Sequence, residues 1–197
     1  SAFAGRSRLI GAPVPVWIPT LGIVANMLVV VGVVVVALNL FGTLSGRYAA
    51  ARASLTLRFI LLSVAGFLLA AVMNLALSMR GFAAIVQFTL LDGLRDWLTF
   101  YVCFSTAMFG AAYFMLPRLT GREWRFAGLI KLHFGATALG VVLMIVGLAA
   151  AGWTQGRLLN DAAVPFADIT KALSFWFAYR TVALAVLLLG HLAFLIN

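Results

Sequence analysis

The sequence places three charged side chains close together in an otherwise apolar stretch. Asp92, Arg95 and Asp96 lie in "FTLLDGLRDWLTFYV", residues 88–102. On a helix, Arg95 lies one turn after Asp92 and directly before Asp96, so it can form an ion pair with either carboxylate. Both carboxylates also suit the positive end of a helix dipole. The guanidinium could instead bind an anion supplied by another molecule, but we favour the ion pairs.

A second cation, Arg180, and a lone imidazole, His191, stand in the last apolar segment. Arg180 follows Lys171 by nine residues, which is about 14 Å along a helix axis. A cation at that depth in a membrane needs a partner. Three explanations stay open. The guanidinium could bind an anion from a lipid, a cofactor or another subunit. It could form a salt bridge within the protein, or the helix could begin later than predicted. His191 has no acid or second histidine near it in sequence, so we expect a packed or cavity-facing side chain.

The composition predicts that these residues sit in a membrane protein. The 197-residue chain is 64% hydrophobic and 10% charged, with a mean hydropathy of +1.12, whereas soluble domains have about 25% charged residues. The net charge is +9, but the basic residues cluster at the ends of apolar runs, as membrane-flanking charges do. We therefore exclude nucleic-acid binding, which needs a contiguous basic surface. The single cysteine, Cys103, predicts neither a disulfide nor a cysteine-based metal site.

Five apolar runs approach or exceed the roughly 20 residues that a membrane span needs. We predict an all-α, polytopic transmembrane helix bundle in a single domain, residues 1–197. The predicted spans are residues 17–40, 57–79, 94–116, 127–153 and 172–196, with the third ending at Pro117 and a short interfacial helix within residues 81–93. The residues before Trp17 lack the cleavage site of a signal peptide. Small residues on one stripe of the fourth span predict close contact with a neighbouring helix: Ala136, Gly140, Gly147 and Ala151.

Polar side chains within or near the spans admit two interpretations. They are Asn26, Asn39, Asn74, Ser63 and Ser105. In a small transporter they would line a path, whereas in a packed bundle they would form interhelical hydrogen bonds. No acidic residue lies near the middle of a span, which argues against a proton pump or cation channel. The dense basic cluster "PRLTGREWR", residues 117–125, favours a cytoplasmic position for that loop, and hence an N-terminus outside.

Four segments of the sequence form a recognisable set: "LRFILLSVAGFLLAAVMNL", "QFTLLDGLRDWLTFYVCFSTAMFGAAYFMLPRLTGREW", "LIKLHFGATALGVVLMIVGLAAAGWTQG" and "ITKALSFWFAYRTVALAVLLLGHLAFLIN". Together they resemble the catalytic subunit of haem-copper oxidases, most closely the cbb-type (C-type) branch and less closely the related nitric oxide reductases. Within them, "GAAYFMLPRL" (residues 110–119), His133–Phe134 and "AGWTQG" (residues 151–156) follow the family's order and spacing. The resemblance runs from about Pro15 to the end. It implies the last five helices of a subunit that has about twelve.

The resemblance also implies a haem position that this sequence does not reproduce. In the family, the third of these helices carries His-x-His near its outer end, and the two histidines ligate a low-spin haem and the haem of the active site. Counting back from Pro117, the matching residues are Arg95 and Trp97. Arginine stays protonated and tryptophan offers only an N–H donor, so neither supplies the lone pair that iron needs. The resemblance assigns the copper ligands and the second low-spin ligand to earlier helices, outside this sequence.

His133 has a counterpart in the family that ligates no metal. It could ligate haem or relay a proton, but we favour a packing histidine that is hydrogen-bonded across the bundle. Arg95 and Arg180 are candidates for contact with a haem propionate or another anion on a partner. We expect no catalytic residue, no metal site and no cofactor of the chain's own, although haem can reside on partner subunits.

These interpretations predict a non-catalytic integral membrane subunit of a respiratory electron-transfer complex. It would be a subunit-I-like scaffold in a bacterial inner membrane, with other membrane subunits and lipid as its partners. Alternatively, the chain is one part of a split haem-copper oxidase or nitric oxide reductase, with the metal-binding helices on another chain. A small transporter is the last alternative.

Overall fold

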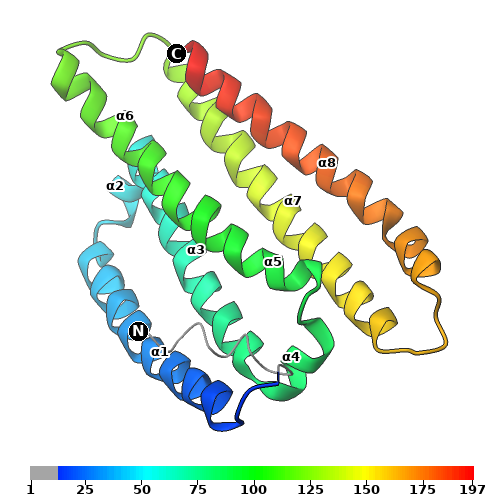
Figure 1. Ribbon diagram of the computed structural model, residues 1–197. Helices are drawn as coiled ribbons and strands as arrows, with labels where there is room; N and C mark the ends of the chain where they lie inside the picture. The colour runs from blue at the N-terminus through cyan, green and yellow to red at the C-terminus, as the bar shows by residue number, and fades with distance from the viewer. Residues whose placement is uncertain (1–12) are drawn as a thin grey trace.

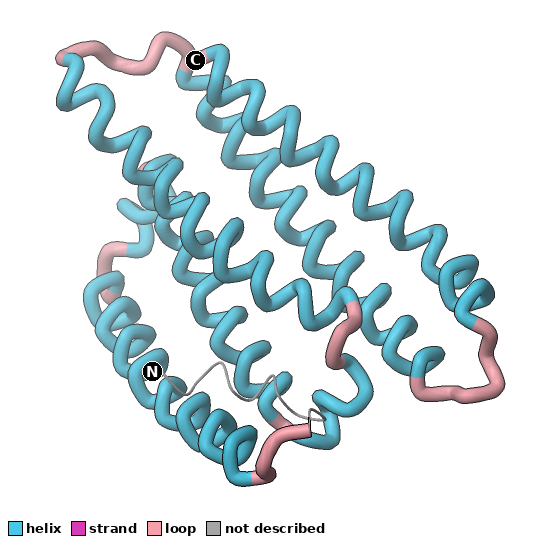
Figure 2. The backbone as a smooth tube through the Cα atoms, viewed as in Figure 1, coloured by secondary structure: helices cyan, strands magenta, loops and turns pink. Residues whose placement is uncertain are grey.

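The structure is a computed structural model that describes residues 13–197, apart from the side chains of Ala50 and Arg52. Over this range the chain consists of helices joined by short connections at the ends of a bundle (Figure 2). The predicted all-α class is therefore confirmed. The prediction about a signal peptide concerns earlier residues and lies outside the described range.

Five helices in the described range are long and apolar enough to cross a membrane. They are Trp17–Leu44 (α1), Leu55–Ser78 (α3), the continuous Leu90–Thr120, Ala127–Leu159 (α7) and Phe166–Ile196 (α8). Each predicted span falls on one of them, although α8 begins before the predicted residue 172. Figure 1 shows α1 at one edge of the bundle and α8, beside α7, at the other. Two short helices, Tyr48–Ala53 (α2) and Arg80–Val86 (α4), lie between longer ones. The short interfacial helix expected within residues 81–93 corresponds to α4, which ends at Val86. The residues from Leu90 onward belong to the next helix, whose N-cap is Thr89.

The third span changes its hydrogen-bond register along its length. It begins as α5 (Leu90–Trp97), widens into a π-helix (η2, Leu98–Ser105) and continues as α6 (Thr106–Thr120). Within the wide turns, the Ser105 hydroxyl donates to the carbonyl oxygen of Phe100 at 3.0 Å. The Ser63 hydroxyl of α3 donates to the carbonyl oxygen of Cys103 at 2.6 Å. Such π-helical turns are rare and are frequently found at functional sites.

The prediction that the third span stops at Pro117 is wrong. Helix α6 continues to Thr120 and ends at Gly121, which has a left-handed φ of 65°. Pro117 has no N–H, so the carbonyl oxygen of Tyr113, four residues earlier, loses its helical partner. The indole N–H of Trp124 donates to this oxygen at 3.2 Å. The loop after the helix thus replaces the hydrogen bond that the proline removes.

Helix α7 approaches its neighbours closely through its small residues, as predicted. A Cβ added at Gly140 would collide with Leu187 of α8, and one added at Gly147 would lie 2.8 Å from the Tyr179 ring. On another face, a Cβ at Gly152 would collide with the backbone nitrogen of Leu91. Both α8 and the start of the third span therefore pack directly against the α7 backbone.

The main core lies where the third span meets α7 and α8. Its buried residues are Ala70, Leu94, Leu98, Val102, Val141, Met144, Leu148, Ala183 and Leu187. Helix α1 is peripheral, since only Pro19, Gly22 and Asn26 of its residues are buried. The Asn26 side-chain amide donates to Ser78 of α3 at 2.6 Å, which supports the interpretation of the mid-span polar residues as interhelical hydrogen-bonding groups.

Replacement of Gly152 by alanine tests this close packing. The added methyl group would force the α7 and α5 backbones apart, and overpacking of this kind costs about 1–3 kcal/mol. The matched control is Gly135→Ala on the same helix, where an added Cβ meets nothing within 4 Å. Thermal unfolding in detergent should show a lower midpoint for Gly152→Ala only. Equal midpoints for both variants would contradict the packing.

Candidate functional site

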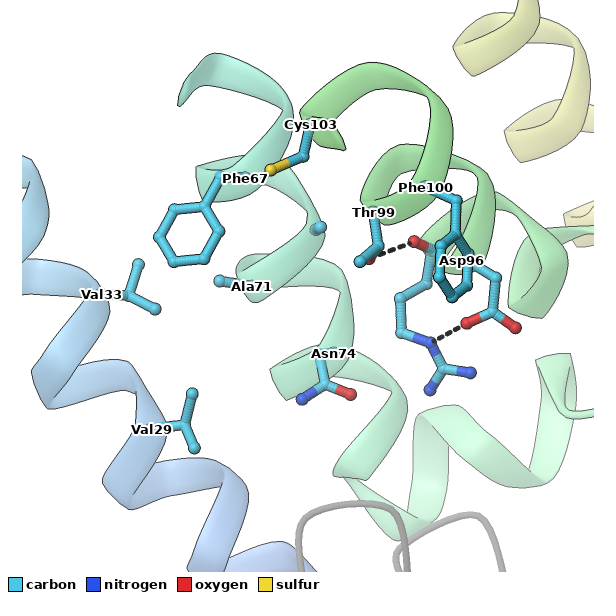
Figure 3. Close-up of a pocket in the computed structure, with 11 residues that line it drawn as sticks. Val29, Val33, Phe67, Ala71, Asn74, Asp96, Thr99, Phe100 and Cys103 are labelled. Carbon is cyan, nitrogen blue, oxygen red and sulfur yellow. Dashed lines mark hydrogen bonds and ion pairs between the residues drawn. The ribbon is translucent and has the colours of Figure 1, made fainter. Parts of the chain in front are cut away.

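Arg95 is buried within the bundle despite its charge, with 6% of its surface exposed. Its Nη2 lies 3.0 Å from Oδ1 of Asp92. Its Nε donates to Oδ1 of Asp96 at 3.2 Å (Figure 3). The side chains of Asp92 and Asp96 are 27% and 45% exposed, so the carboxylates reach outward while the guanidinium stays inside. Both ion pairs that the sequence suggested are therefore formed. We refer to Asp92, Arg95 and Asp96 as the ion trio.

A cavity of about 460 Å³ lies beside the ion trio. Residues of α1, α3 and the third span line it, with α3 between the other two (Figure 3). The lining residues are Val29, Val33, Phe67, Ala70, Ala71, Asn74, Arg95, Asp96, Thr99, Phe100 and Cys103. The cavity is therefore largely apolar, with one charged end.

The cavity lining does not fit a haem held by histidine. No lining residue is an imidazole, and the nitrogens of Arg95 carry protons and face carboxylates. Cys103 is the lining residue with a sulfur donor. Trp97, the other position that the resemblance assigned to a ligand, stacks on Tyr101 with ring centroids 5.1 Å apart. Among the described residues, no group of three or more His, Cys, Asp or Glu side chains could hold a metal ion.

His191, which has no acid or second histidine near it in sequence, meets its partners on other helices. Its Nδ1 lies 3.4 Å from Nε2 of His133, and its Nε2 lies 2.8 Å from the Tyr101 hydroxyl. The Nδ1 of His133 in turn lies 2.9 Å from the Tyr113 hydroxyl. Four side chains from η2, α8, α7 and α6 thus form one series of hydrogen bonds, which we call the Tyr–His chain.

His133 is fully enclosed, with 0% of its surface exposed. Rings of Phe59, Phe109 and Phe194 surround it at centroid distances of 4.6–5.4 Å. Because both of its ring nitrogens have protein partners, iron could bind there only by displacing one of them. His133 is thus packed among aromatic rings and hydrogen-bonded to side chains of α6 and α8.

Arg180 faces outward near the middle of α8. The helix begins at Phe166, so Arg180 lies about 21 Å from its start, and the later helix start considered above does not occur. No carboxylate in residues 13–197 lies within ion-pair distance of the guanidinium. Within this range, therefore, the bundle itself provides no salt bridge to Arg180. Lys171, by contrast, pairs with Asp168 at 3.2 Å on the exposed surface.

The all-α, membrane-spanning fold agrees with what comparison with known proteins finds. Residues 8–186 match the family model for cytochrome c and quinol oxidase polypeptide I, so the chain belongs to this family. A similar curated protein is the Cbb3-type cytochrome c oxidase subunit CcoN1 of Stutzerimonas stutzeri. It is 26% identical over 208 aligned residues, which cover 99% of this chain and 43% of the relative. The predicted resemblance to subunit I of cbb-type oxidases is thus confirmed, and the chain spans less than half the length of that relative.

Replacement of Arg95 by methionine tests the ion trio. The two carboxylates would lose their shared cation, at a cost of about 1–3 kcal/mol, less than for a fully buried pair because both are partly exposed. A variant with Asp92→Asn, Arg95→Met and Asp96→Asn together should recover most of that loss, because no charge then lacks its counterion. Lys171→Met, which breaks an exposed pair, is the control and should change the unfolding midpoint little. A combined variant as unstable as Arg95→Met alone would show that the guanidinium acts through packing and not through charge.

Proposed function

We propose that this chain is a non-catalytic integral membrane subunit of a respiratory electron-transfer complex, a subunit-I-like scaffold without haem or copper ligands of its own. The supporting observation is the ion trio. Arg95 stands where the resemblance assigns a haem ligand, and its guanidinium is held by two carboxylates of the same helix. A protonated, ion-paired arginine has no lone pair for iron. Any haem of the complex would then belong to its partner subunits.

The outward-facing Arg180 supports the existence of such a partner. Exposed apolar side chains surround it on α8, including Phe177, Val182 and Leu184. A charge on a lipid-facing surface at this depth is costly unless it finds an anion. A partner helix that carries a carboxylate, or a cofactor propionate held by a partner, would satisfy the guanidinium, and lipid would cover the remaining apolar surface. The complex would lie in a bacterial inner membrane with the N-terminus of this chain outside.

Extraction of the native complex in mild detergent, followed by mass measurement, tests the proposed partnership. The account predicts a mass well above the 21.1 kDa of the chain, with other membrane proteins in the particle. An isolated monomer from native membranes would contradict it.

Arg180→Leu should reduce the recovery of those partner proteins by about tenfold or more, since a lost buried ion pair exceeds 1.4 kcal/mol. Arg180→Lys, which keeps the charge, should retain more of them than Arg180→Leu. Lys131→Leu removes an exposed cation near the start of α7 and is the matched control. Equal recovery with Arg180→Leu and Lys131→Leu would count against a partner anion at Arg180.

The chain aligns with less than half of CcoN1, and this difference in length favours a second candidate function. Because the chain aligns with 43% of that subunit, it could be one part of a split haem-copper oxidase or nitric oxide reductase. The metal ligands would then come from another chain. An absorption spectrum of the purified complex, combined with separation of its subunits, distinguishes the two. Haem that requires both this chain and another haem-copper-like chain would favour the split enzyme over the scaffold.

A further inference from the structure

We propose that the Tyr–His chain is a proton relay, which connects a cavity at the end of the bundle with Tyr101 in its interior. This inference rests on the hydrogen-bond geometry within the chain and does not depend on the proposed scaffold function. The relay comprises Tyr113, His133, His191 and Tyr101 in that order.

The series can carry hydrogen bonds in either of two directions. A neutral imidazole donates from one ring nitrogen and accepts at the other, and a tyrosine hydroxyl can do both. In the first polarity, the Tyr113 hydroxyl donates to His133 Nδ1, His133 Nε2–H donates to His191 Nδ1, and His191 Nε2–H donates to the Tyr101 oxygen. In the second polarity every bond reverses. In both polarities, every ring nitrogen of both histidines has a hydrogen-bond partner.

The Tyr113 end of the relay meets an open cavity of about 460 Å³. Tyr113 lines this cavity together with the exposed Arg118 and Glu123, whose charges place the opening at the level of headgroups and water. Its carbonyl oxygen accepts from Trp124, another lining residue, so the loop that forms the cavity also holds Tyr113 in place. The first member of the series therefore borders an open cavity.

Tyr101, the other end of the relay, lies about three helical turns from Tyr113 along the third span, toward the start of that span. Tyr101 belongs to η2, is partly exposed, and stacks on Trp97. The relay therefore reaches from the end of the bundle to a surface in its membrane interior that is open to a partner.

The side chains around the two imidazoles favour movement of a proton along the Tyr–His chain over its loss to a neighbouring group. Phe59 of α3, Phe109 of α6 and Phe194 of α8 enclose His133, and Phe109 also stacks on His191. None of these rings can exchange a proton. The titratable groups that face the imidazoles are each other and the two tyrosines, while Arg118 and Glu123 stand at the mouth of the cavity.

One passage conserves every atom and charge. A proton from water in the cavity joins the Tyr113 oxygen, and the original hydroxyl proton of Tyr113 moves to His133 Nδ1. The His133 Nε2 proton moves to His191 Nδ1, and the His191 Nε2 proton moves to the Tyr101 oxygen. The original Tyr101 proton leaves toward a base on whatever lies against Tyr101. The passage converts the first polarity into the second, and rotation of the hydroxyls with return of the tautomers resets it.

A purely structural series predicts something different. Hydrogen bonds that only hold the third span, α7 and α8 together require no proton transfer, and each histidine would then keep a single tautomer. A relay requires that both tautomers of both histidines are populated and interconvert. The number of tautomers populated by each histidine therefore distinguishes a relay from a purely structural series.

Nuclear magnetic resonance of the full chain in lipid bilayers, labelled with ¹⁵N-histidine, can measure the tautomer populations directly. The sequence contains two histidines, so the spectrum reports His133 and His191 alone. The relay predicts both tautomers for each ring and exchange of their N–H protons with D₂O. Tyr113→Phe should slow that exchange by about 10²-fold or more, because the positioned hydroxyl that passes the proton is gone. Tyr101→Phe should slow it similarly by closing the other end.

Tyr179→Phe is the matched control, because it removes a tyrosine hydroxyl from α8 outside the relay and should leave exchange unchanged. Circular dichroism establishes that each variant is folded, and the wild-type spectrum tests the proposal even if a variant is not. A single tautomer for each ring in the wild-type protein would overturn the relay. Unchanged exchange in folded Tyr113→Phe would also overturn it, because protons would then reach the rings by another route.

Discussion

The structure depends on one constraint: hydrocarbon contains no water, so every polar group within the bilayer must be satisfied by the protein. Arg95 meets this constraint through Asp92 and Asp96 on its own helix. The carbonyl oxygen that Pro117 leaves free meets it through the indole of Trp124. The two buried imidazoles meet it through each other and two tyrosines. These bonds join the third span to α7, α8 and the loop between α6 and α7.

The same constraint distinguishes the interior of the bundle from its two outer helices, α1 and α8. Around α7, small residues let neighbouring backbones approach closely, and both ring nitrogens of the buried His133 have partners. Arg180 differs, because it lies near the middle of α8, faces outward and has no ion pair within residues 13–197. Helix α1 likewise contributes few buried residues. Both outer helices of the bundle therefore present surface that fits further membrane helices, which agrees with a family whose member CcoN1 is more than twice as long as the aligned part.

Much of this fold could be predicted from the sequence because the decisive signals are local. Apolar runs gave the five spans, and the spacing of Asp92 and Arg95 gave their ion pair, since residues three apart meet on a helix. The pairing of His133 with His191 could not be predicted, because they are 58 residues apart and meet only once α7 and α8 pack. The continuation of α6 past Pro117 depends on where a later loop places Trp124. The π-helical turns shift the side-chain register of the third span, and no feature of the sequence indicated them.

The central claim is that an ion-paired arginine occupies the place where the family resemblance puts an iron ligand. An electron cryomicroscopy map of the native complex, taken at a resolution that shows side chains, tests this most directly. The account predicts density for the Arg95 guanidinium between the carboxylates of Asp92 and Asp96, with no porphyrin iron bonded to any side chain of this chain. Porphyrin density with its iron bonded to a residue of the third span would contradict it.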